Sequence, residues 1–283
     1  METAKIAGPI SGKRLYQERA RAALPLLVRQ GHAESPIYYS ELAVELGMPN
    51  PRNLNFVLGS IGQTLKALSK QWRQEVPPIQ CLVVNKHTGL PGEGIGLFIT
   101  DKEDFRKLPR RQQRRLVEAE LQKVFAFRHW PEVLRALNLK PTKQNYADTL
   151  SRASAFHSGG ESEDHRKLKE FVASNPPILQ LPPGLSGTTE YPLPSGDCID
   201  VLFQQKDEWI AVEVKSKLSP EADIARGVFQ CIKYRAVIEA YQASLEIPQN
   251  ARIILVLEAS FPRLLVPLKN MLGVEVLDKV TPR

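Results

Sequence analysis

Apolar residues in the first half of the chain recur every three or four positions, which is the spacing of one face of an α-helix. Gly31 and Gly47 follow two of these periodic stretches, in the place where a glycine commonly ends a helix. The continuous apolar run over residues 79–84 predicts a strand, and the turn-rich segment 85–94 predicts a loop. The periodicity predicts helices over residues 15–31, 41–46, 52–69 and 102–127.

The second half has a different pattern, in which short apolar runs alternate with helical stretches. The dipeptide Lys206-Asp207 separates two of these runs and predicts a tight β-hairpin. The order αβββαβ, followed by a further αβ, predicts a mixed sheet flanked by helices, in the α/β or α+β class. The expected helices cover residues 163–174, 221–243 and 264–271, and the expected strands cover 188–193, 198–204, 208–216, 252–258 and 274–277.

A polar segment without periodicity divides these two patterns. It covers residues 141–160 and ends in Ser158-Gly159-Gly160, so we expect a linker between a domain at 1–140 and a domain at 161–283. In the first domain, a short helix, a tight turn, a longer helix and a strand with a long loop resemble a winged helix-turn-helix. That resemblance implies a DNA-binding domain whose helical extension is basic.

Composition excludes several classes of protein. With 42% hydrophobic and 24% charged residues in 283, the chain is a globular protein rather than a disordered one. The three cysteines lie far apart and form no CxxC, which argues against a disulfide framework or a zinc ribbon and indicates the cytoplasm. No long apolar run or signal-peptide pattern predicts a membrane segment.

The net charge of +7 comes entirely from the first half. Residues 1–150 contain 23 Lys and Arg against 14 Asp and Glu, whereas the remaining residues contain 15 against 17. Such a surface favours a polyanion, because each neutralised phosphate releases counterions; a merely solvated basic surface is the alternative. The candidate DNA contacts are Arg52, Asn53, Asn55, Gln63, Lys66, Arg110, Arg111, Arg114 and Arg115.

Three charged residues stand inside otherwise apolar strands: Asp200, Glu213 and Lys215. Side chains alternate along a strand, so Glu213 and Lys215 share one face, and the hairpin brings Asp200 to the neighbouring strand. Two carboxylates on adjacent strands can hold Mg²⁺ or Mn²⁺, and a nearby lysine can contact a metal-bound water or a phosphate. The alternative is a solvated ion pair on an exposed strand face.

These residues resemble the PD-(D/E)XK nuclease superfamily. The matching segments are Ser195-Gly196-Asp197-Cys198-Ile199-Asp200 and Glu213-Val214-Lys215, with Ile199 in place of the proline. The resemblance implies a restriction-endonuclease-like core in which Asp200 and Glu213 bind Mg²⁺, with Mn²⁺ as a substitute. It also implies that the Val214 carbonyl contributes to the metal site and that Lys215 is catalytic.

Further positions extend the resemblance on either side. Gln230 and Tyr234 resemble the QxxxY signature of some branches, which implies that they orient Lys215 or contact phosphate; packing of the tyrosine against the sheet is the alternative. Glu163 resembles the acidic residue on the preceding helix that completes the metal site, with Glu161 as its rival. A first-turn glutamate favoured by the helix dipole is the alternative for Glu163. His129, His157 and His165 show no metal-ligand spacing and are expected to be surface or packing residues.

The combined expectation is a magnesium-dependent DNA endonuclease that leaves 5′-phosphates. One site cuts one strand, so duplex cleavage requires a homodimer or two successive nicks. Restriction of foreign DNA is the expected setting. The alternatives are a nuclease of repair, transposition or branched-DNA resolution, and a non-catalytic DNA-binding regulator.

Overall fold

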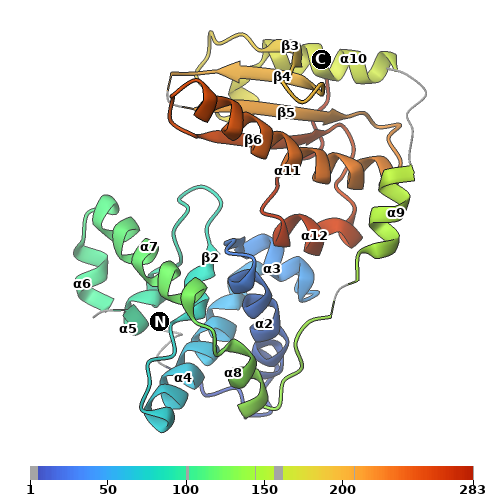
Figure 1. Cartoon of the computed structure of the whole chain (residues 1–283). Helices are drawn as coiled ribbons and strands as arrows, with labels where there is room; N and C mark the ends of the chain where they lie inside the picture. The colour runs from blue at the N-terminus through green and yellow to red at the C-terminus, as the bar shows by residue number, and fades with distance from the viewer. Residues whose placement is uncertain (1–5, 100–101, 144, 156–161, 207, 283) are drawn as a thin grey trace. The chain divides into compact units, whose positions relative to one another are not determined.

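A computed structural model describes residues 6–99, 102–143, 145–155, 162–206 and 208–282. They form two compact units, Met1–Gln144 and Asn145–Arg283, and each unit has hydrophobic cores of its own (Figure 1). In the part of the chain that is described, no helix is both long enough and apolar enough to cross a membrane.

The first unit is mainly helical. The apolar faces of its long helices meet in one core around Leu24, Ile61 and Trp130. The predicted helices over 15–31, 41–46 and 52–69 are confirmed within a few residues at each end. The unit contains α2 (Leu15–His32), β1 (Ile37–Tyr38), α3 (Tyr39–Glu45), α4 (Leu54–Trp72), β2 (Val83–Val84), α5 (Gly96–Ile99), α6 (Lys102–Lys107), α7 (Arg110–Ala126) and α8 (Trp130–Ala136).

The predicted hairpin wing is wrong. Ile79–Leu82 is a 3-10 helix, and β2 pairs with β1 in parallel rather than with a following strand. The loop after β2 closes on itself, because the Asn85 side chain accepts hydrogen bonds from the His87 and Thr88 amides and the Asn85 amide donates to the Leu90 carbonyl. This closed turn leads into α5 and not into a second strand.

The basic helix predicted over residues 102–127 is divided into α6 and α7. Leu108 and Pro109 separate the two, because proline lacks an amide hydrogen and disfavours the helical conformation of the residue before it. The Gln113 side chain ties the two helices together by donating to the carbonyls of Phe105, at 3.0 Å, and Leu108, at 3.2 Å. The arginines of α7 therefore lie on a fixed helix.

The second unit is built on a five-stranded sheet in the order β3-β4-β5-β6-β7. Strands β3, β4 and β5 are antiparallel neighbours, whereas β5, β6 and β7 are parallel. The mixed sheet and the predicted order of elements are confirmed, although the predicted hairpin residue Asp207 lies outside the described residues. The unit contains α9 (Ala147–Ala155), α10 (Glu163–Ser174), β3 (Thr188–Pro192), β4 (Cys198–Gln204), β5 (Trp209–Lys215), α11 (Glu221–Ser244), β6 (Ala251–Leu257), α12 (Val266–Met271) and β7 (Glu275–Leu277).

Helices cover both faces of this sheet (Figure 1). Ile210, Val212 and Val214 of β5 pack with Leu168 and Val172 of α10. On the other face, Trp209 and Ala211 pack with residues of α11 such as Val228 and Tyr234. Every residue of β5 is buried, as expected for the central strand of a covered sheet.

The segment predicted to be a linker, 141–160, contains a helix. Helix α9 packs on α11, with Ala153 buried in the core on that face of the sheet. The division between the two units falls between residues 144 and 145, so α9 belongs to the sheet-containing unit.

Candidate active site

Strands β4 and β5 stop pairing next to Asp200. Their ladder runs from Gln204–Trp209 to Val201–Val212. One position further along β4, the Asp200 Oδ2 accepts a hydrogen bond of 2.8 Å from the Val214 amide. The Asp200 carboxylate thus accepts the hydrogen bond in place of a main-chain carbonyl. This contact holds the carboxylate at the point where the two strands separate.

Glu213 and Lys215 lie on the α11 face of β5, and both are buried. Only 4% of Glu213 and 6% of Lys215 is exposed, and Lys215 Nζ lies 2.9 Å from Glu213 Oε1. Because an exposed strand face would leave these side chains in water, the alternative of a solvated ion pair is excluded. Even when two buried charges are paired, removing them from water can cost more than their attraction returns, a cost that an apolar strand would avoid.

A second carboxylate holds the same amine. Lys215 Nζ lies 3.1 Å from Asp223 Oδ1, in the first turn of α11. Burial lowers the pKa of Lys215, but the charges of Glu213 and Asp223 outweigh it and raise the pKa above the usual value. The amine therefore stays protonated. Asp223 was not predicted, because an acid in a first helical turn is equally well explained by the helix dipole.

The predicted pair Gln230 and Tyr234 lies directly behind this lysine. Lys215 Nζ donates to Gln230 Oε1 at 3.4 Å, and Gln230 Nε2 donates to the Tyr234 hydroxyl at 3.1 Å. The hydroxyl in turn donates to the Cys198 carbonyl at 3.3 Å. Tyr234 also packs in the core beneath α11. The two residues therefore connect the amine to the start of β4 and limit its movement.

Glu163 does not face this cluster. Its side chain is 64% exposed and pairs along its own helix with Lys167, at 3.1 Å, and Arg166, at 3.6 Å. Nine residues separate Glu163 from the buried Val172, which places the two on opposite sides of α10. Glu161, the rival candidate, lies outside the described residues. The structure thus gives no geometric support to the predicted role of Glu163 in metal binding.

Helix α10 instead brings a histidine to the site. His165 Nε2 lies 3.4 Å from Asp200 Oδ1, and Ser162 caps the helix by accepting from the His165 amide. Burial lowers the pKa of His165, but the hydrogen bond and the charge of Asp200 outweigh it, so the net shift is upward. The sequence predicts only a surface or packing role for His165. The signal was present in the helical spacing, since His165 shares a face with Leu168 and Val172.

Carboxylates outnumber the amine in this cluster, which contains Asp200, Glu213, Asp223 and Lys215. Burial raises the pKa of Glu213 to about 7, and the nearby charge of Asp200 contributes in the same direction. Both effects show that the carboxylates of this cluster exceed what one amine can neutralise, an imbalance that a bound cation would offset.

Replacing Glu213 with glutamine is expected to remove a loss of stability that the wild-type protein shows in EDTA as the pH rises. The folded protein keeps the Glu213 proton up to about pH 7, whereas the ordinary pKa is 4.5. The folded state then binds more protons than the unfolded state, so wild-type stability falls as the pH rises between these values. The stability of E213Q relative to the wild type should therefore rise between pH 5 and pH 8. Urea unfolding of both proteins at pH 5 and pH 8 measures the difference in their free energies of unfolding. An equal difference at the two pH values would contradict the raised pKa of Glu213.

The predicted DNA contacts fall into two groups. Helix α4 has six consecutive buried residues, 57–62, which cover more than a full turn, so this part of the helix has no exposed face. Of the five α4-region candidates, Arg52, Asn53, Asn55 and Lys66 are exposed at its two ends and Gln63 is half-buried. This pattern does not fit the predicted placement of the helix in a DNA groove. By contrast, the α7 candidates Arg110, Arg111, Arg114 and Arg115 are all exposed.

The donor set of the cluster fits a hard divalent cation, although the described residues contain no preformed group of three or more His, Cys, Asp and Glu ligands. Asp200 and Glu213 offer oxygen, which Mg²⁺ and Mn²⁺ prefer. Glu213 has one oxygen, Oε1, engaged with Lys215, whereas both oxygens of Asp200 have partners, Oδ2 the Val214 amide and Oδ1 the His165 ring. Comparisons of the sequence with known protein families, with curated proteins and with solved structures gave no match.

Proposed function

We propose that this protein is a metal-dependent DNA endonuclease of the PD-(D/E)XK type. The observation that carries the proposal is the burial of Glu213 and Lys215 beside Asp200, at the point where β4 and β5 separate. A protein gains no stability from such a cluster that an apolar core would not supply. Buried titratable groups of this kind, with a perturbed pKa, are typical of active sites.

Asp200 and Glu213 would hold Mg²⁺, with the Val214 carbonyl as a further donor. When bound, the ion would lower the pKa of a coordinated water and neutralise charge on the phosphate. With Glu213 bound to the ion, the N–H group of Lys215 that contacts Glu213 would be released and would donate a hydrogen bond to a phosphate oxygen. Gln230 and Tyr234 would keep the amine in place, and His165 would orient the Asp200 carboxylate.

The exposed arginines of α7 would dock the DNA backbone. Arg110 and Arg114, and likewise Arg111 and Arg115, are one helical turn apart, so four guanidinium groups lie close together. Phosphate contacts of this type position DNA without reading its sequence. Restriction of foreign DNA is the proposed setting, and a homodimer would allow both strands to be cut.

A cleavage panel tests this function. Supercoiled plasmid, linear duplex, nicked duplex and four-way junctions are incubated with the wild-type protein in Mg²⁺ or in EDTA. Cleavage that requires Mg²⁺ and leaves 5′-phosphates is expected; nicked circles indicate one active site, and linear products indicate paired sites. Preference for junctions would favour a repair or resolution enzyme. Specific duplex binding without any cleavage in Mg²⁺ or Mn²⁺ would favour a regulator and overturn the proposal.

Gly227→Ala is expected to remove most activity with little effect on stability. A Cβ at Gly227 would lie 2.9 Å from both Lys215 Cε and Leu255 Cδ1, so the lysine must shift. Alanine favours a helix over glycine by about 1 kcal/mol, which partly offsets an overpacking cost of about 1–3 kcal/mol. A displaced catalytic group can lower the rate about 100-fold. Cleavage rates and urea unfolding of the same preparation measure both effects, and unchanged cleavage would contradict the position assigned to Lys215.

A further inference from the structure

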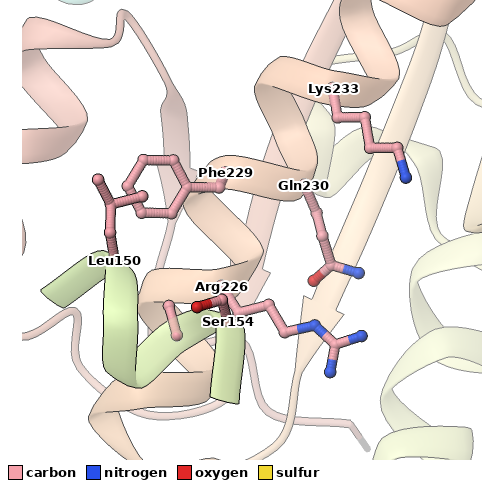
Figure 2. A pocket seen from close by; sticks show the side chains of 7 residues that line it. Leu150, Ser154, Arg226, Phe229, Gln230 and Lys233 are labelled. Carbon is pink, nitrogen blue, oxygen red and sulfur yellow. The ribbon is translucent and has the colours of Figure 1, made fainter. Parts of the chain in front are cut away.

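A pocket lies between α9 and α11 (Figure 2). Its volume is about 290 Å³, close to the lower end, about 300 Å³, of the range found for small-molecule sites. Its size therefore suits one small ring system rather than a segment of double helix. The lining residues are Leu150, Ala153, Ser154, Arg226, Phe229, Gln230 and Lys233.

The pocket has an apolar side and a cationic side. Figure 2 shows Leu150 of α9 facing the ring of Phe229, while Arg226, Gln230 and Lys233 extend their polar ends away from this pair. Lys233 is 56% exposed and pairs with Asp197 at 2.6 Å. A flat apolar group could lie against Phe229, with an attached anion near Arg226 and Lys233.

Gln230 joins the pocket to the active site. The same side chain lines the pocket and accepts a hydrogen bond from Lys215. A group bound in the pocket is therefore one side chain away from the amine that would contact the scissile phosphate. Adjacent nucleotides of one strand could occupy the pocket and the active site.

We propose that this pocket binds a single unstacked nucleobase of the DNA strand that is cut, with its phosphate near Arg226 and Lys233. The inference rests on the proposed nuclease function and adds a substrate class to it. Every nucleobase has a π-face that stacks on an aromatic side chain, and Arg and Lys attract the backbone. A base of a duplex can enter only when it is extruded from the stack, so an unpaired nucleotide at the cut should favour binding.

Binding of single-stranded oligonucleotides in EDTA tests this proposal without cleavage. The probes are a short fluorescent oligonucleotide and a chain of the same length in which every position is abasic. Base stacking contributes about 1–3 kcal/mol, so Phe229→Ala should weaken binding of the intact probe roughly 5- to 150-fold and abolish its preference over the abasic probe. Ile232→Ala is the matched control, because Ile232 is a partly buried α11 residue of the same core that does not line the pocket.

Leu150→Ala, on the opposite wall and on another helix, gives an independent variant if Phe229→Ala fails to fold. Equal affinity for intact and abasic probes, or equal effects of Phe229→Ala and Ile232→Ala, would overturn the inference. Base-dependent binding without any cleavage in Mg²⁺ would leave the pocket supported and the nuclease function refuted. Cleavage without base-dependent binding would support the nuclease function and refute the pocket proposal.

Discussion

Lys215→Met is expected to lower the rate of DNA cleavage by about 10²–10³-fold, the usual effect of removing one fixed charge-stabilising donor from an active site. The amine is held by Glu213 at 2.9 Å and Asp223 at 3.1 Å, so no other lysine can replace it without rebuilding the cluster. Methionine keeps much of the buried volume while removing the charge. Initial rates on a fluorescent duplex in Mg²⁺ measure the effect.

The control for this variant is Lys217→Ala. Lys217 follows two positions later, but its side chain is 55% exposed and pairs with Asp164, so cleavage should change little. Lys215→Met also leaves two buried carboxylates without their amine, which costs about 3–5 kcal/mol. Circular dichroism at the assay temperature must therefore show that the variant is folded. A folded variant with wild-type activity would contradict the catalytic role of Lys215.

Asp200→Asn is expected to remove metal-dependent stabilisation along with cleavage. Asparagine retains an oxygen that can accept from the Val214 amide, so the separation of β4 and β5 should be preserved. It removes the charge that would bind the cation. Wild-type protein should be stabilised by about 2.7 kcal/mol when Mg²⁺ reaches 100 times its dissociation constant, and D200N should show almost none of this gain.

Thermal unfolding with increasing Mg²⁺ measures this difference independently of activity. Asp197→Asn is the matched control, since Asp197 belongs to the same segment but pairs with Lys233. Equal Mg²⁺ stabilisation of wild type and D200N would show that the cation binds elsewhere.

Strand β5 and its charged residues could both be predicted from the sequence. The strong apolar pattern predicts the strand, and the charged residues that interrupt this pattern mark the candidate site. Strand alternation placed Glu213 and Lys215 on one face, and the hairpin placed Asp200 on the adjacent strand. Strand alternation could not predict that these charges are buried, because their burial depends on α11 covering that face. It also could not predict the contact of Asp223 with Lys215, because tertiary packing brings the start of α11 to the end of β5.

The errors have a common origin in tertiary context. Glu163 resembles an acidic motif residue, but the apolar spacing of Leu168 and Val172 turns His165 toward the sheet instead. Likewise, the apolar run before Asn85 predicts a strand of a wing, but most of it forms a 3-10 helix. Short apolar runs specify burial more firmly than they specify the type of element.

The most direct test of the metal site is anomalous scattering from crystals grown with Mn²⁺. The account predicts a manganese peak bound by the carboxylates of both Asp200 and Glu213 in wild-type crystals, and its absence in D200N crystals. Manganese bound only at other sites, with Glu213 still closed on Lys215 and Asp200 still turned to His165 at saturating metal, would contradict the central claim.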